Sequence, residues 1–315
     1  MSRRPSQERQ KPHVVEPIAR SHHQAVATGS SVSGRPSPLA PGLVPRAVPM
    51  FDAYAPPQIA QRVQEVGVAK ASAPVQTTVA LAVLAGAFIA LGALFFTVTV
   101  TGSSAMGGSA PFGLTRLAGG LAFSLGLILV VVGGAELFTG NNLIAMAWAA
   151  GRIRTTEVLR NWGWVYLGNL IGALGTVALA LLAGVDRLGD GAVGETAIRI
   201  ARAKVELDPV AALARGVLCN VLVCLAVWLC VGARGVADKI LAIVFPITAF
   251  VACGFEHSVA NMYFLPVGVA LTMGSGAPVA VQDVLLNLAL VTLGNILGGT
   301  VLVALVYWFV YLRKS

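Results

Sequence analysis

Two short polar segments interrupt long apolar stretches of this sequence, and each contains one glutamate. In the first segment Glu136 is followed by Thr139, and in the second Glu256 is followed directly by His257. A carboxylate accepts hydrogen bonds, a hydroxyl donates and accepts them, and an imidazole gains or loses a proton near neutral pH. If the fold brings them together, these groups can bind a small anion and exchange a proton with it.

His257 is the strongest functional candidate of the four. It is the only histidine after residue 55, and it has no metal-binding spacing such as HxxxH or HExxH and no Cys/His cluster, so we predict no metal and no cofactor. A lone histidine is often structural, but an ionisable group within a membrane segment is a functional candidate by default. We expect Thr139 to fall within one residue of the position equivalent to His257, so that its hydroxyl faces the imidazole across a small polar site.

The two glutamates have two possible interpretations. An ionised side chain at the centre of a membrane helix costs ~2.5–3.5 kcal/mol, so neither Glu136 nor Glu256 is expected to face lipid. The favoured interpretation is structural: each carboxylate accepts hydrogen bonds from backbone N–H groups that are freed where a helix unwinds. The alternative is direct contact with a substrate.

The composition places these segments in a membrane protein. Of 315 residues, 56% are hydrophobic and 11% are charged, with a mean hydropathy of +0.78, whereas soluble domains carry about 25% charged residues. Several charge-free stretches reach about 20 residues, the length that a helix needs to cross a hydrocarbon layer ~30 Å thick. The 22 basic residues exceed the 14 acidic ones, but they lie in the N-terminal segment or at the ends of apolar runs, which does not indicate nucleic-acid binding. The four cysteines are expected to be small buried side chains, because all lie in apolar runs without CxxC spacing: Cys219, Cys224, Cys230 and Cys253.

The apolar pattern predicts six membrane spans, two of them broken helices. The spans are expected at 79–100, 117–150 (broken), 165–185, 211–231, 240–271 (broken) and 284–312, with a polar loop of about 30 residues between the third and the fourth. The positive-inside rule favours cytoplasmic N- and C-termini. The basic residues of the predicted cytoplasmic loops and terminus are Arg152, Arg154, Arg160, Arg234, Lys239, Arg313 and Lys314.

The chain is expected to have three parts. Residues 1–55 are rich in Ser, Pro, Arg and His without apolar periodicity, which predicts a disordered basic tail. Residues 56–72 show helical spacing of apolar positions and predict an amphipathic helix in the membrane interface, or alternatively a solvated helix. Residues 73–315 form the predicted transmembrane transport domain.

An internal repeat relates the two polar segments. Each contains the pattern GxExxxxN, beginning at Gly134 and at Gly254, and each is followed later by Gly-Asn-x-x-Gly, at 168–172 and 294–298. Three predicted spans separate the copies, so the second copy must enter the bilayer in the opposite direction. Inverted repeats with broken helices in matching positions indicate a transport pathway near the bilayer midplane.

These motifs resemble the formate–nitrite transporter family over residues 57–313. The matching segments are AELFTG at 135–140, NW at 161–162, GN at 168–169, CNVLVCLAVW at 219–228 and GFEHSVANM at 254–262. The resemblance implies an all-α membrane protein in the inner (plasma) membrane, with six transmembrane helices as two inverted three-helix repeats and broken helices 2 and 5. It also implies an aquaporin-like fold and a homopentamer in which each protomer has its own pore.

The resemblance also implies roles for individual residues. His257 and Thr139 match the central pair of the family, and Asn220 and Lys204 match pore-lining and vestibule positions. The remaining matches are the apolar constrictions Phe123, Leu127, Phe250 and Leu137, and the helix-break residues Glu136, Glu256 and Asn261.

A transport hypothesis follows from this assignment. Lys204 would draw a monovalent anion towards the pore, and His257 would either protonate it, so that it passes as the neutral acid, or balance its charge as a cation. Formate is the favoured substrate because the run FSLGLIL at 123–129 is most similar to the formate branch; nitrite and hydrosulfide are the alternatives within the family.

An intramembrane hydrolase using Ser258 is disfavoured, because adjacent helical residues point about 100° apart. A water or glycerol channel does not explain the histidine and the lysine.

Overall fold

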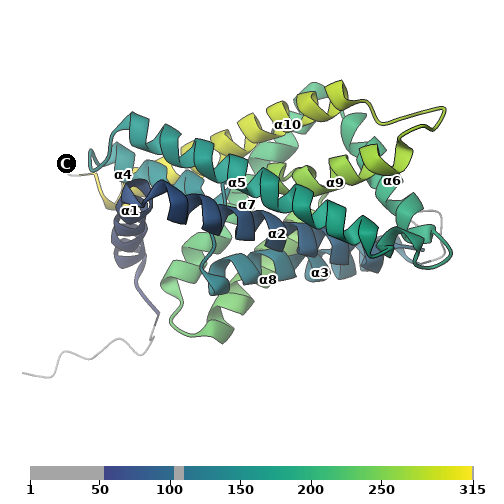
Figure 1. The fold of residues 1–315 in the computed structure, drawn as a ribbon. Coiled ribbons are helices and arrows are strands. Elements are labelled where there is room, and N and C mark those ends of the chain that lie inside the picture. The colour runs from purple at the N-terminus through teal and green to yellow at the C-terminus, as the bar shows by residue number, and fades with distance from the viewer. Residues whose placement is uncertain (1–52, 103–109, 314–315) are drawn as a thin grey trace, which may run out of the picture. The chain divides into compact units, whose positions relative to one another are not determined.

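The computed structural model describes residues 53–102 and 110–313, and within these ranges every regular element is a helix. Of the tail predicted over 1–55, only 53–55 are described, and Lys314 also lies outside the described residues. The helices, in chain order, are α1 (Pro56–Ser72), α2 (Val75–Val100), α3 (Phe112–Gly133), η2 (Gly140–Ile144), α4 (Ala145–Ala149), α5 (Thr155–Leu182), η3 (Val185–Arg187), α6 (Ala192–Val205), α7 (Pro209–Gly232), α8 (Val236–Ala252), α9 (Ser258–Thr272), α10 (Val281–Ile296), η4 (Leu297–Leu305) and α11 (Val306–Tyr311) (Figure 1).

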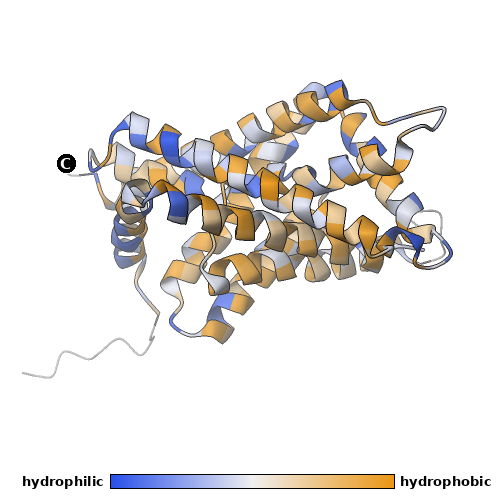
Figure 2. Cartoon of the chain, in the orientation of Figure 1, coloured by the Kyte–Doolittle hydropathy of each residue, from blue (hydrophilic) through white to orange (hydrophobic). Residues whose placement is uncertain are grey.

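The long helices have the composition of membrane spans. In the described part of the chain, five helical stretches are long and apolar enough to cross a bilayer: α2, α3, α5, α7 and the continuous run Val281–Tyr311. Figure 2 shows apolar residues along these helices and polar residues gathered towards their ends. The predicted fifth span is divided into α8 and α9, with 17 and 15 residues. Neither half meets the length of a full span, so the count of six stays a prediction.

Both predicted breaks are present. α3 ends at Gly133, and the next residue, Gly134, has a φ of 76°. α8 ends at Ala252, and Gly254 has a φ of 71°. Both values lie in the left-handed region, where glycine is favoured because it has no Cβ to clash with the backbone. The repeated glycines of GxExxxxN therefore terminate α3 and α8.

The two halves of the chain pack in the same way. α2 packs against α3 and α5, and α7 packs against α8 and α10. Glycines allow these contacts, because a Cβ at Gly172 would lie 1.9 Å from the carbonyl oxygen of Val83, and one at Gly298 would lie 2.2 Å from that of Val217. Such close approach of helix backbones is typical of small residues in membrane proteins. The short helices α1 and α6 lie at opposite ends of the long helices (Figure 1).

Two expectations about local structure were wrong. The polar loop predicted between the third and fourth spans contains the helix α6, whose buried residues Val193, Ala197 and Ile200 recur at helical spacing. This face packs against α9, and the charged residues between its apolar positions had suggested a loop. Cys253 is exposed whereas the other three cysteines are buried, because it is the C-cap residue of α8 at the helix break.

α1 covers the bounds expected for the amphipathic helix. Ile59 and Val63 are buried on one face, which packs against η2, α4 and α7. A position of α1 in the membrane interface stays a prediction.

Candidate functional site

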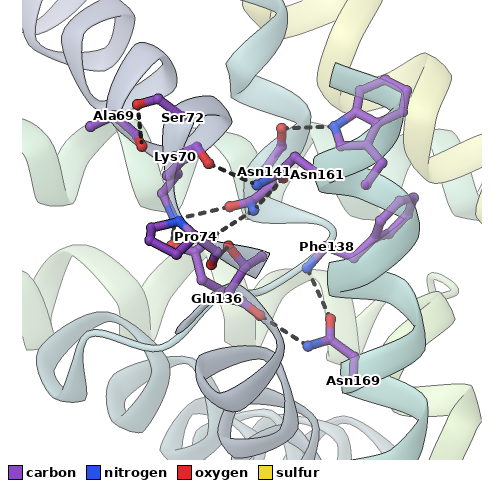
Figure 3. Close-up of polar contacts among 11 residues, drawn as sticks. Ala69, Lys70, Ser72, Pro74, Glu136, Phe138, Asn141, Asn161 and Asn169 are labelled. Carbon is purple, nitrogen blue, oxygen red and sulfur yellow. Dashed lines mark hydrogen bonds and ion pairs between the residues drawn. The ribbon is translucent and has the colours of Figure 1, made fainter. Parts of the chain in front are cut away.

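One asparagine holds the backbone at the first helix break. The side chain of Asn169 on α5 accepts a hydrogen bond from the backbone N–H of Phe138 at 2.9 Å. Its amide nitrogen donates to the carbonyl oxygens of Ala82 at 2.8 Å and Glu136 at 2.9 Å. A single buried amide therefore satisfies three backbone groups at the unwound segment, where unpaired groups are costly. Figure 3 shows Asn169 between Phe138 and Glu136.

A second asparagine does the same at the other break. Asn295 on α10 accepts from the backbone N–H of Ser258 at 2.9 Å and donates to the carbonyl oxygens of Gly216 at 2.8 Å and Glu256 at 3.0 Å. Asn169 and Asn295 are the asparagines of the repeated Gly-Asn-x-x-Gly. Their function at the breaks was not recognised in the sequence, although the repeated motif was.

The glutamate carboxylates bind side chains. At the first break, Glu136 accepts from the ammonium of Lys70 at 2.6 Å and from the side-chain amide of Asn141 at 2.7 Å. Asn141 in turn donates to the side chain of Asn161 at 2.9 Å (Figure 3). The expectation that these carboxylates accept the freed backbone N–H groups was therefore wrong, because Asn169 and Asn295 already fill that role. Each carboxylate instead binds a lysine of a short helix, Lys70 of α1 or Lys204 of α6. A structural function for the two glutamates, rather than contact with a substrate, stays a prediction.

The second break repeats this network. Glu256 accepts from Lys204 at 2.9 and 3.0 Å and from the side-chain amide of Asn261 at 2.7 Å. Asn261 donates to Asn287 at 2.8 Å. The Lys204 side chain is 15% exposed and its ammonium is paired with Glu256, and its role in drawing an anion into the vestibule stays a prediction. Lys70 on α1 is the counterpart of Lys204, and its pairing with Glu136 was not predicted. The sequence shows only a lysine at the end of an amphipathic helix, where a solvated side chain is the usual expectation.

His257 and Thr139 lie together, as expected. The Nε2 of His257 is 3.0 Å from the hydroxyl oxygen of Thr139, and both residues are buried, at 3% and 0% exposure. His257 is also the N-cap of α9, where its Nδ1 accepts from the backbone N–H of Ala260 at 3.1 Å. Because Nδ1 accepts, a neutral ring carries its proton on Nε2 and donates it to Thr139. The hydroxyl proton of Thr139 is then available to another acceptor.

The expected symmetry of this pair was wrong. The register of GxExxxxN places Leu137, not Thr139, at the position equivalent to His257, and pairs Thr139 with Val259. The imidazole therefore has no polar counterpart in the first copy. It contacts Thr139 because the two unwound segments lie side by side.

A cavity of about 360 Å³ reaches His257 from the α6 end of the protein. Phe123 and Phe250 also line it, with ring centroids 5.6 Å apart and an edge-to-face geometry. The ring of Phe250 stacks at 5.9 Å from that of His257. Lys204 and Glu256 line the same cavity. The apolar side chains next to the imidazole thus include two of the predicted constriction residues.

The other predicted pore residues lie deeper. Leu127 and Leu137 are 2% and 3% exposed and do not line this cavity. Asn220 donates to the backbone oxygens of Thr139 at 3.3 Å and Asn295 at 2.7 Å, while its side-chain oxygen has no hydrogen-bond partner among the described residues. Asn220 thus lies beside the Thr139 segment.

A second, much smaller cavity of about 40 Å³ lies at the α1 end and is lined by Lys70, Gly140 and Val227, among others. The two cavities have no lining residue in common. The cavity at the α6 end therefore reaches His257, whereas the smaller cavity at the α1 end has neither His257 nor Thr139 in its lining.

The comparisons with known proteins agree with this geometry. The family described as formate/nitrite transporter matches residues 57–309 of this chain. The formate channel FocA of Escherichia coli (strain K12) is 41% identical over 280 residues, which cover 84% of this chain and 97% of that protein. A solved pentameric formate channel with formate bound has 40% identity and a TM-score of 0.69, covering 76% of this chain and 98% of its own. A solved FNT family ion channel has 29% identity and a TM-score of 0.72, covering 80% of this chain and 98% of its own.

The match extends over nearly the whole length of these relatives and over both helix breaks of this chain. The all-helical membrane fold expected from the motifs is confirmed. This chain belongs to the formate/nitrite transporter family.

Proposed function

We propose that this protein moves formate across the membrane through a pore in each protomer of a homopentamer. The relatives named as formate channels and the solved pentamer with formate bound support this choice of substrate and assembly. Nitrite and hydrosulfide, which are also small monovalent anions of weak acids, are the alternative substrates.

The observation that carries the proposal is the contact between His257 and Thr139 behind the Phe123 and Phe250 rings. A bare carboxylate that passes these rings loses its hydration, at a cost of many kcal/mol, whereas a neutral acid loses far less. In the neutral Nε2–H tautomer the ring donates to the Thr139 hydroxyl, whose own proton is then available to a carboxylate. Formate is therefore held where its charge is most costly, and proton transfer there permits passage as formic acid.

Protonation of His257 has a structural cost. A cationic ring carries a proton on Nδ1, which must then give up the hydrogen bond from Ala260 N–H that caps α9. In the proton-relay version of the mechanism, His257 gains this proton only transiently and passes it to formate, with resupply from solvent. In the competing version, His257 stays cationic and balances the charge of formate, which keeps its negative charge.

The orientation is part of the proposal. The basic residues Arg152, Arg154 and Arg160 lie just before and within the first turns of α5, at the end that α1 and α4 occupy. The positive-inside rule places that end in the cytoplasm of an inner-membrane protein, together with both termini. The cavity that reaches His257 then opens to the outside.

Flux into proteoliposomes tests the function. An imposed formate gradient across vesicles that contain the purified protein and an internal pH dye is expected to change the internal pH, with no increase in water permeability over empty vesicles. Competition of labelled formate uptake by nitrite then ranks the substrates. A protein that carries neither formate nor nitrite faster than empty vesicles overturns the proposal.

A further inference from the structure

The mouth of the cavity is strongly cationic. Its lining includes Arg116, Arg199, Arg215 and Lys204, and its one carboxylate is Glu256. Glu256 is already bound by Lys204 and by the amide of Asn261, and Arg199 lies 3.9 Å from the carboxylate of Glu195, which leaves Arg116 and Arg215 as the arginines to consider.

Two of these arginines converge on one point of the backbone. Arg116 donates to the carbonyl oxygens of Val251 and of Ala252, the latter at 3.0 Å. Arg215 lies 3.5 Å from the carbonyl oxygen of Gly254. A Cβ on Gly254 would be 3.2 Å from Arg116 Nη2 and 3.9 Å from Arg215 Nη1. The two guanidinium groups therefore lie near each other, and among the described residues no carboxylate lies within 4.0 Å of either.

The inverted repeat shows that termination of a half-helix does not require these charges. The register that pairs Gly134 with Gly254 pairs Arg116 with Val236. When the two repeats are aligned so that Lys70 matches Lys204, Arg215 matches Leu81 and Arg199 matches Glu65. α3 thus ends at its break without an equivalent of Arg116. The three arginines therefore have no arginine equivalents in the other repeat, and they lie where the cavity that reaches His257 opens.

The cavity is also larger and more aromatic than formate requires. Its volume of about 360 Å³ falls within the range of small-molecule sites, ~300–1,000 Å³. Five phenylalanines contribute to its lining: Phe96, Phe123, Phe250, Phe255 and Phe264. Guanidinium groups bind carboxylate and other oxyanions with paired hydrogen bonds, and the phenylalanine rings suit an apolar body attached to such a group.

We propose that Arg116 and Arg215 form a second anion site, distinct from the His257–Thr139 pair, for a monovalent oxyanion with an apolar body about the size of a benzene ring. Such an anion fills the cavity but does not pass between Phe123 and Phe250, so it blocks entry to the pore. The blocking effect rests on the proposed transport function, whereas the binding does not.

Benzenesulfonate is a suitable probe, because it stays charged at all accessible pH values and does not cross the bilayer as a neutral acid. Calorimetric titration of the full-length protein in detergent is expected to show one saturable site per protomer. Arg215→Gln is expected to weaken binding by about tenfold or more, since it removes a charged donor to the ligand. The affinity of the conservative Arg215→Lys is expected to lie between those of Arg215→Gln and the unaltered protein. Lysine keeps the positive charge but does not form the paired hydrogen bonds of a guanidinium group.

The matched controls lie close by. Arg202→Gln alters an arginine of α6 that donates to the carbonyl oxygen of Ala277 and does not line the cavity, so it is expected to bind like the unaltered protein. The uncharged benzenesulfonamide is expected not to bind. Arg215 is exposed, so its replacement leaves the core intact, and a melting temperature equal to that of Arg202→Gln checks this.

Formate flux separates this inference from the proposed function. In vesicles that conduct formate, external benzenesulfonate is expected to reduce the flux, and a higher concentration is expected to be needed for Arg215→Gln. Absence of formate flux overturns the proposed function but leaves the titration to decide the site. Formate flux without saturable benzenesulfonate binding, or binding that is equal in Arg215→Gln and Arg202→Gln, overturns the second anion site.

Discussion

Asn169 and Asn295 make the same three backbone hydrogen bonds at the two helix breaks. Each accepts one N–H from the half-helix or turn that follows the break and donates to two carbonyl oxygens. The correspondence extends to the helices that supply the carbonyls, Ala82 on α2 and Gly216 on α7. The two breaks are therefore equivalent structures, held by one asparagine each.

Replacing either asparagine with alanine is expected to destabilise the protein. Asn169→Ala leaves the Phe138 N–H and two carbonyl groups buried without their partner, at about 1–3 kcal/mol for each unsatisfied group. Asn295→Ala is expected to have a similar effect. Thermal unfolding in detergent measures this, and a melting temperature within error of the unaltered protein for either variant contradicts the assigned role.

The ion pair of Lys70 and Glu136 gives a sharper test, because the partners can be removed together. Lys70→Met leaves a mostly buried carboxylate without its cation and is expected to cost about 3–5 kcal/mol. Adding Glu136→Gln removes the charge, and the double variant is expected to recover most of that stability. If the double variant is as unstable as the sum of both single changes, the two side chains are not coupled. Lys204→Met with Glu256→Gln repeats the test at the other break.

The close contact of α2 and α5 depends on Gly172. Alanine there would place its Cβ 1.9 Å from the carbonyl oxygen of Val83, so Gly172→Ala is expected to separate the helices and reduce the yield of folded protein. Gly175 lies on the same helix with nothing within 4 Å of a Cβ, and Gly175→Ala is the matched control. Size-exclusion chromatography of the detergent extract compares the two, and equal folded yields contradict the packing argument.

The two functions of His257 can be separated by choice of substitution. Asparagine is a good N-cap residue, so His257→Asn is expected to keep the α9 cap while it removes the titratable ring. His257→Phe loses both. If the ring relays protons, formate flux in the unaltered protein rises as the pH falls, and this rise is expected to flatten in both variants, while only His257→Phe loses thermal stability.

The competing version of the mechanism gives a different result. If a cationic His257 balances the charge of formate, both variants are expected to lose flux at acidic and neutral pH alike. A pH profile that is unchanged in His257→Asn excludes the histidine relay. Vesicle flux measured across a pH series, with Thr139→Val as a variant that removes the hydroxyl but not the ring, distinguishes these outcomes.

The sequence alone determined the class of protein and the position of its breaks. Charge-free stretches of membrane length and the repeated GxExxxxN require only local information, because hydrophobic length and glycine at a helix end act within one segment. The helix α6 was missed for the same reason: its buried face is defined by contact with α9, and the segment by itself resembles a polar loop.

Only the tertiary structure decided the partners of the polar side chains. Lys70 and Glu136 are 66 positions apart, and Thr139 and His257 are 118 positions apart, so no spacing in the sequence indicates that they meet. The sequence suggested that the carboxylates bind the freed backbone groups, but Asn169 and Asn295 lie closer to those groups once α5 and α10 pack against the breaks. The physical reason is that burial requires every polar group to find a partner, while the packing of distant helices decides which partner is within reach.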